Sequence, residues 1–176
     1  MAVIEAISTT YLEADAASVT FSSIPSTYEH LQLRVSSHDS YDAGTDILYA
    51  RFNSDSGTNY SYHFMEGYSS STNGGGGINQ TYAWLGTIEG SYGATLASTY
   101  GGVIVDILDY ANTNKNTTTQ SISGVVDPRP TNNVAMRSSL WDDTSAVTQI
   151  DLYGIIYAGG GFVRGTTFTL YGLNSS

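Results

Sequence analysis

The chain has 176 residues, a length that suits one domain with a single hydrophobic core. Its 16 acidic and 6 basic residues give a formal net charge of −10, which disfavours binding to the phosphate backbone of nucleic acids. It contains no cysteine, which excludes disulfides, a thiol nucleophile and zinc binding through sulfur.

The N-terminal stretch MAVIEAISTTYLEADAASVTF has early acidic residues and no basic flank before a long apolar run, so it is not a secretion signal. No apolar run in the chain approaches the roughly 20 residues of a membrane helix, and we expect no membrane partner. The apolar start AVIEAIS instead predicts a contact surface for a partner or a second copy. Its candidate contact residues are Val3, Ile4, Ile7, Tyr11 and Leu12.

The next part of the chain predicts three strands. ASVTFSSIPSTY contains a short strand and a turn at Pro25, because proline cannot donate to a strand ladder. In HLQLRVSS, Leu31, Leu33 and Val35 fall on one face and polar residues on the other, which indicates a half-buried strand. TDILYARFN follows as the third strand.

The segment ARFNSDSGTNYSYHFMEG, residues 50–67, is typical of a strand, a tight turn and a second strand, and predicts a hairpin. Asn53, Asp55 and Gly57 have the spacing of the first ligands of a calcium loop, but the closing glutamate is missing. The same residue types form an ordinary β-turn, which we favour. Asn53 and Asp55 remain the candidate calcium ligands, and no other cofactor is expected.

Residues 69–80, SSSTNGGGGINQ, contain four consecutive glycines, which have the largest backbone entropy of any residue. We predict a flexible surface loop here. The composition does not change on either side of it, so it is not a linker between domains. Residues 1–176 are therefore predicted to form a single domain.

Further strands are predicted at YAWLGTI, GGVIVDILDY, KNTTTQSISG, VAMRSSLW, AVTQIDLYGIIYAG and TTFTLYGL. About ten short strands separated by turns, without a helix, predict an all-β fold, an antiparallel β-sandwich of jelly-roll type. VIVDIL is apolar on both faces, so we place it centrally in a sheet.

Catalysis has little support in the sequence. Asp106 and Asp109 differ by three positions, which places them on opposite faces of a regular strand. Asp142 and Asp143 follow Trp141 in a predicted turn, and either would suit glycoside hydrolysis, but no partner carboxylate is evident. No nucleophile motif occurs, and we predict that the protein is not an enzyme.

The 14 tyrosines allow two interpretations. Tyrosine fills half-buried strand positions, which we favour, but its ring and hydroxyl also suit stacking on sugars. The candidate sugar-binding loop tyrosines are Tyr60, Tyr62, Tyr68, Tyr82, Tyr92 and Tyr100.

Five stretches, in order, cover most of the chain and carry a family resemblance. They are ASVTFSSIPSTYEHLQLRVSS, RFNSDSGTNYSYH, VDILDYANTNKNTTTQSISG, SSLWDDTSAVTQIDLYG and FVRGTTFTLYGL. Together they resemble small virion structural proteins of tailed bacteriophages, especially those of cyanobacterial and aquatic phages. RFNSDSGTNYSYH resembles a hairpin signature of this family.

The resemblance implies a jelly-roll-like domain that is made in the host cytoplasm and becomes part of the virion. Its implied role is a capsid decoration or cement protein that bridges subunits of the major capsid protein. The alternative is a tail or fibre component that binds host-surface carbohydrate through tyrosine-rich loops. We expect self-association as a homotrimer, because assembly covers exposed sheet edges.

Overall fold

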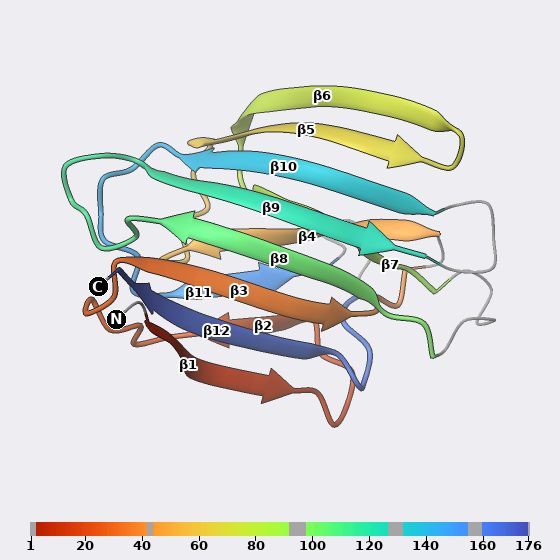
Figure 1. The fold of residues 1–176 in the computed structure, drawn as a ribbon, viewed down its shortest axis with the longest axis horizontal. Helices are drawn as coiled ribbons and strands as arrows, with labels where there is room; N and C mark the ends of the chain where they lie inside the picture. The colour runs from red at the N-terminus through yellow and green to blue at the C-terminus, as the bar shows by residue number, and fades with distance from the viewer. Residues whose placement is uncertain (1–2, 42–43, 92–97, 127–131, 155–159, 176) are drawn as a thin grey trace.

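The computed structural model describes residues 3–41, 44–91, 98–126, 132–154 and 160–175. Within these residues the chain forms twelve strands and no helix. The strands make two antiparallel sheets that pack face to face (Figure 1). The predicted all-β, jelly-roll-like sandwich is confirmed, with twelve strands where about ten were expected. No helix in the described part of the chain is long and apolar enough to cross a membrane.

The larger sheet has eight strands in the order β1-β12-β3-β8-β9-β10-β5-β6. Strands β1 and β12 lie at one edge and β5 and β6 at the other (Figure 1). The bounds are β1 Val3–Tyr11, β3 His30–Ser37, β5 Tyr60–Tyr68, β6 Ser71–Gln80, β8 Gly101–Leu108, β9 Thr117–Val125, β10 Asn133–Trp141 and β12 Thr167–Asn174.

The smaller sheet has four strands in the order β2-β11-β4-β7 and covers one face of the larger sheet. Its bounds are β2 Ser18–Phe21, β4 Thr45–Phe52, β7 Ala83–Glu89 and β11 Ile150–Tyr153. The core lies between the two sheets. We call the face of the larger sheet that points away from this core the outer face.

Alternation along the strands explains which side chains enter the core. Leu31 and Leu33 of β3 are fully buried, as predicted from HLQLRVSS. Strand β8, which includes VIVDIL, is central in the larger sheet, as expected. Its two faces differ, however, because Val105 is fully buried whereas Ile104 is 41% exposed on the outer face. The apolar residue on the second face is therefore left uncovered by the fold.

The hairpin predicted for residues 50–67 is wrong. Strand β4 pairs with β7 and β11 in the smaller sheet, whereas β5 pairs with β10 and β6 in the larger sheet. The turn after Phe52 therefore carries the chain from one sheet to the other. Asn53 and Ser54 have positive φ, which suits a tight reversal. Such residues favour a sharp turn but do not determine whether the two flanking strands pair with each other.

The flexible loop predicted for residues 69–80 is also wrong for most of its length, because Ser71–Gln80 form β6. This edge strand pairs with β5 along the glycine run. The glycines allow a close approach that a side chain would prevent. A Cβ atom at Gly76 would lie 2.6 Å from the carbonyl oxygen of Tyr62, and one at Gly77 would lie 2.8 Å from the Tyr62 ring.

The first and last strands of the chain are neighbours. Strand β1 pairs with β12 over most of its length, with a register shift between Ala6 and Ser8. Strand β12 in turn pairs with β3. The two ends of the chain therefore lie side by side (Figure 1).

Candidate functional site

The outer face of the larger sheet carries a row of exposed apolar side chains. Ile104 of β8 is the cross-strand partner of Ile122 of β9, which pairs with Met136 of β10, which pairs with Met65 of β5. Their exposed fractions are 41%, 52%, 55% and 63%. We call these four residues the apolar row. A contiguous apolar row on four adjacent strands is typical of an interaction surface.

A groove runs beside the apolar row, with a volume of about 590 Å³. Gly102 and Gly124, which are cross-strand partners, form part of its lining. A Cβ atom at Gly102 would meet nothing within 4 Å, so the glycines leave this space open. Ile104 and Ile122 line the same groove. An apolar side chain of a partner protein that entered the groove would be shielded from water on several sides, which favours binding.

A polar network adjoins the apolar row, because Arg34 of β3 is the cross-strand partner of Ile104 and also lines the groove. Gln32 Nε2 donates a hydrogen bond of 2.8 Å to Asp106 Oδ1, and Arg34 Nε donates one of 2.9 Å to Gln32 Oε1. The Arg34 guanidinium also lies 5.0 Å from the ring centroid of Tyr171. Arg34 and Asp106 carry one positive and one negative charge, so the network is neutral in a protein of net charge −10. It suits the polar rim of an interface.

The candidate calcium ligand Asp55 is engaged by protein donors. Its Oδ1 accepts a hydrogen bond from the Gly57 backbone, and its Oδ2 accepts from Asn59 Nδ2 and Trp141 Nε1 at 2.8 and 2.7 Å. Burial acts to raise the pKa of Asp55, but the bonds from Trp141, Gly57 and Asn59 outweigh it and hold the pKa below its usual value. The carboxylate therefore holds the turn to β10.

The second candidate ligand, Asn53, also binds the protein. Its Oδ1 accepts hydrogen bonds from the backbone of Thr148 and Gln149, and its Nδ2 donates to the carbonyl of Ala146. Within the described residues, histidine, aspartate and glutamate nowhere gather as three or more that suit a metal ion. Calcium binding by Asn53 and Asp55 stays a prediction.

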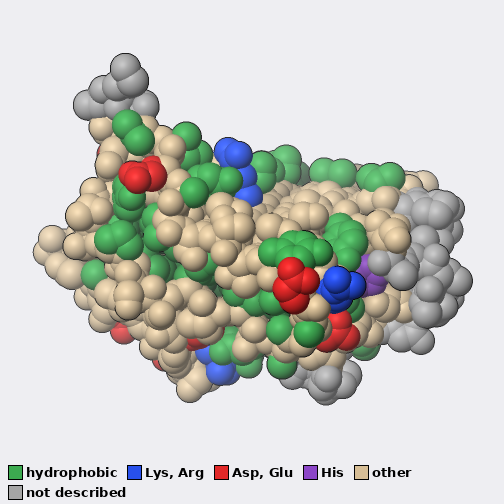
Figure 2. Space-filling model, turned by 90° about the horizontal axis from the view of Figure 1, so that it is seen from below, with side chains coloured by type: hydrophobic (Ala, Val, Ile, Leu, Met, Phe, Trp, Pro, Cys, Tyr) green, Lys and Arg blue, Asp and Glu red, His purple; other side chains and the backbone are tan. Residues whose placement is uncertain are grey.

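The N-terminal contact residues divide into two groups. Val3, Ile4 and Tyr11 are 46%, 51% and 53% exposed on β1. Ile7 is partly buried against the core and Leu12 is 8% exposed, so the other three are the more exposed members of the group. Figure 2, seen from the β1 side, shows hydrophobic side chains at several places on this surface. This edge remains a second candidate contact surface.

The candidate carboxylates each have a hydrogen-bond partner of their own. Asp106 belongs to the outer-face network, whereas Asp109 lies in the turn after β8 and bonds with Lys115. Asp142 accepts a hydrogen bond from Asn116, and Asp143 accepts one from the backbone of Ser145. The partners of these last three carboxylates all lie outside the strands.

The candidate sugar-binding tyrosines do not gather on loops. Tyr60, Tyr62 and Tyr68 lie on β5, where Tyr60 is fully buried and Tyr62 stacks on Trp84 with ring centroids 3.9 Å apart. Tyr82 packs edge-on against Tyr49 and Tyr153. Tyr100 donates a hydrogen bond to the carbonyl of Arg164. Tyr92 lies outside the described residues. Packing inside the protein therefore accounts for Tyr60, Tyr62 and Tyr82, whereas Tyr68 is 39% exposed.

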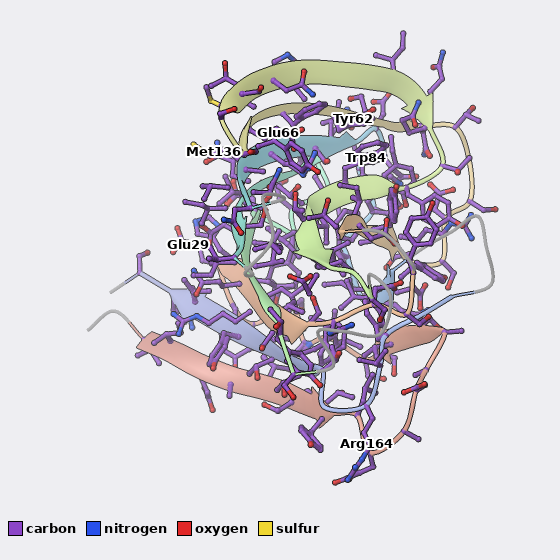
Figure 3. All side chains as sticks on the ribbon, turned by 90° about the vertical axis from the view of Figure 1, so that its right-hand side faces the viewer. Glu29, Tyr62, Glu66, Trp84, Met136 and Arg164 are labelled. Carbon is purple, nitrogen blue, oxygen red and sulfur yellow. The ribbon has the colours of Figure 1, made fainter. Side chains whose placement is uncertain are left out.

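A small pocket lies between the sheets and is lined by residues of β4, β5, β7 and β10. Its volume is about 180 Å³, and its lining includes Phe64, Trp84, Glu66, Asn133 and Arg137. We call it the inter-sheet pocket. Figure 3 shows Tyr62 and Glu66 of β5 close to Trp84 of β7, with Met136 of β10 pointing away on the outer side.

Arg137 is the central polar group of this pocket. Its Nη2 donates to Thr87 Oγ1 at 2.9 Å and to Glu66 Oε2 at 3.4 Å, and Asn133 Nδ2 donates to the same Glu66 oxygen at 3.1 Å. The guanidinium carbon lies 4.9 Å from the Phe64 ring centroid. Burial lowers the pKa of Arg137, and the charge of Glu66 opposes this change.

Neither the apolar row nor the inter-sheet pocket was predicted from the sequence. Their residues come from separate strands, so no local motif marks them. One signal was present in VAMRSSLW. By alternation along the strand, Arg137 falls on the same inward face as Ala135 and Trp141. A charged residue at an inward position indicates a buried partner or a ligand.

A partly buried carboxyl group, that of Asp46, lies at the start of β4. Burial, with a further contribution from the charge of Asp39, raises the pKa of Asp46 to about 6, although a hydrogen bond from the Ile47 backbone opposes this. Asp46 Oδ2 is buried and has no hydrogen-bond partner among the described residues. The charged form is therefore unfavourable in the folded state.

We expect the Asp46→Asn variant to be more stable than the wild type at pH 7.5 by about 1–2 kcal/mol. The folded pKa of Asp46 lies above its unfolded value, so its favourable contribution is complete below about pH 4 and is lost as the pH rises through about 6. Urea unfolding at pH 7.5 and pH 4 measures this. Exposed Asp15→Asn is the control, and an equal gain at both pH values would contradict the assignment.

No known family model matches this sequence, and no curated protein matches it. Among solved structures, the chain is similar to galectin LEC-6 of Caenorhabditis elegans, with a TM-score of 0.36, 6% identity and coverage of 95% of this chain and 96% of the galectin. It is also similar to the alginate lyase vAL-1 from Chlorella virus, with a TM-score of 0.29, 9% identity and coverage of 99% and 85%.

Proposed function

We propose that this protein is a non-catalytic structural protein of a bacteriophage virion, a capsid decoration or cement protein. The apolar row on the outer face carries the proposal. The row consists of one side chain from each of four adjacent strands, Ile104, Ile122, Met136 and Met65. The hydrogen bonds between these strands hold the four side chains in fixed positions. A rigid apolar surface beside a neutral polar rim suits attachment to a large assembly better than bond making.

The partner in this proposal is the major capsid protein, bound by the apolar row and its groove. The exposed β1 edge, with Val3 and Ile4, is left for contact between copies of the chain in a homotrimer. An unpaired edge strand invites such pairing, and assembly would cover it. The family resemblance of the sequence supports the same role.

We expect the Met136→Lys variant to bind purified capsids at least tenfold more weakly than the wild type. Binding would bury the charged lysine in the middle of the apolar row and remove its hydration, which is costly. A tenfold loss of affinity requires a cost of only about 1.4 kcal/mol. Co-sedimentation with capsids measures this. Val126→Lys changes a residue that is 72% exposed outside the strands and is the control. Equal binding by both variants and the wild type would refute attachment through the apolar row.

Immunogold electron microscopy of purified virions, with an antibody against this protein, determines where on the particle the protein lies. Label over the whole shell supports the decoration or cement role. Label only at the tail would favour the alternative, a tail or fibre component. The tyrosine-loop form of that alternative has little support, because Tyr60 and Tyr62 point into the protein.

A further inference from the structure

The inter-sheet pocket contains two buried polar atoms without partners. Arg137 Nε, a donor, and Asn133 Oδ1, an acceptor, have no hydrogen-bond partner among the described residues. Both residues line the pocket and are 5% and 3% exposed. An unpaired buried group costs about 1–3 kcal/mol, and native proteins retain few of them. Two in one cavity indicate a ligand that supplies both an acceptor and a donor.

The charges around the pocket restrict the class of ligand. The Arg137 guanidinium is already balanced by Glu66, and the two oxygens of Glu66 accept from Asn133 and from Asn73. An anionic ligand would be repelled by Glu66, and a cationic one by Arg137. A neutral ligand with hydroxyl groups avoids both, because each hydroxyl both donates and accepts.

The walls of the pocket indicate an apolar ring face as well. Phe64, Trp84 and Tyr68 contribute to the lining. Aromatic walls with amide, hydroxyl and guanidinium groups at the floor match a pyranose ring, which has apolar C–H faces and hydroxyls around its edge. The volume of about 180 Å³ is several times the roughly 30 Å³ of one water molecule, so a single bridging water would not fill it.

We propose that the inter-sheet pocket binds one neutral pyranose unit of a glycan. Arg137 Nε donates to a ring hydroxyl, Asn133 Oδ1 accepts from one, and Trp84 and Phe64 contact the ring. This site lies on the core side of the larger sheet, whereas the apolar row lies on the opposite side. It therefore does not depend on the proposed attachment to a capsid, and one protein would bind both partners at once.

Trp84 provides a direct reporter for the experiment. The chain has two tryptophans, and the second, Trp141, is buried in the core. The full chain is titrated with methyl glycosides of glucose, galactose and mannose while tryptophan fluorescence is recorded, and calorimetry repeats the measurement without an optical probe. We expect saturable binding of at least one neutral glycoside, with a fluorescence change that is absent in Trp84→Phe. The methyl glycoside of glucuronic acid tests the exclusion of anions.

Neighbouring residues of β10 give a matched pair of variants. Arg137→Lys keeps the positive charge but removes Nε, and should weaken glycoside binding at least tenfold, whereas Met136→Lys on the opposite face should leave it unchanged. Tyr68→Ala, at a partly exposed position of the lining, provides a second test if Arg137→Lys is unstable. The proposal is refuted if no neutral glycoside binds and the pocket holds water only, if the glucuronide binds best, or if Met136→Lys weakens binding as much as Arg137→Lys.

Discussion

Replacing Trp141 with alanine is expected to lower the free energy of unfolding by about 3–5 kcal/mol, the largest effect among our predictions. Trp141 is 2% exposed and packs against Phe52 and Tyr60, with ring centroids 5.7 and 6.4 Å away. Phe52 belongs to the smaller sheet and Tyr60 to the larger one, so the cavity would open where the chain passes between the sheets.

Urea unfolding followed by far-ultraviolet circular dichroism measures this loss. The Trp141→Phe variant should lose less, because a ring still fills most of the space. Tyr11→Ala, on the exposed edge strand, should change the free energy of unfolding by no more than about 0.5 kcal/mol. A loss below 1 kcal/mol for Trp141→Ala would mean that this aromatic cluster does not join the sheets.

The second large effect is expected for Asp55→Ala, a loss of about 2–4 kcal/mol that does not depend on calcium. The substitution leaves the Trp141 indole, the Gly57 backbone and the Asn59 amide without their acceptor. The wild-type pKa of Asp55 lies below its unfolded value, so this stabilisation is present above about pH 4 and is lost as the pH falls through the folded pKa.

Thermal unfolding with EDTA and with added calcium separates the two roles of Asp55. A structural carboxylate gives the same melting temperature in both conditions, for the wild type and the variant. Stabilisation of the wild type by calcium, absent in Asp55→Ala, would instead establish the metal site. Asp142→Ala is a control, since this exposed carboxylate accepts one hydrogen bond from a side chain in a turn.

Local patterns in the sequence predicted single strands well. The alternation of Leu31, Leu33 and Val35 identified the buried face of β3, because burial on one face of a pleated strand has a period of two. Apolar residues on both faces of VIVDIL predicted a central position for β8, which is confirmed. The exposure of Ile104 was not predicted, since an exposed apolar residue looks the same in sequence as a buried one.

Pairing between strands was harder to predict. The residues that reverse the chain after Phe52 are those of a hairpin turn, yet the next strand joins the other sheet. The run Gly74–Gly77 has the composition of a loop, but its lack of side chains is what lets β6 lie against Tyr62 and Phe64. In both cases the tertiary neighbours decided the structure, and local propensity did not.

The pairing of β1 with β12 has a consequence for the order in which the molecule forms. Strand β1 is synthesised before β12 and has no partner until residues 167–174 leave the ribosome, and β3 lacks one of its two neighbours until then. Contacts between such distant segments close late, because the intervening chain must first be ordered. A nascent chain therefore exposes Val3, Ile4 and the edge of β3 throughout translation. Chains halted before β12 should associate through these edges rather than remain monomeric.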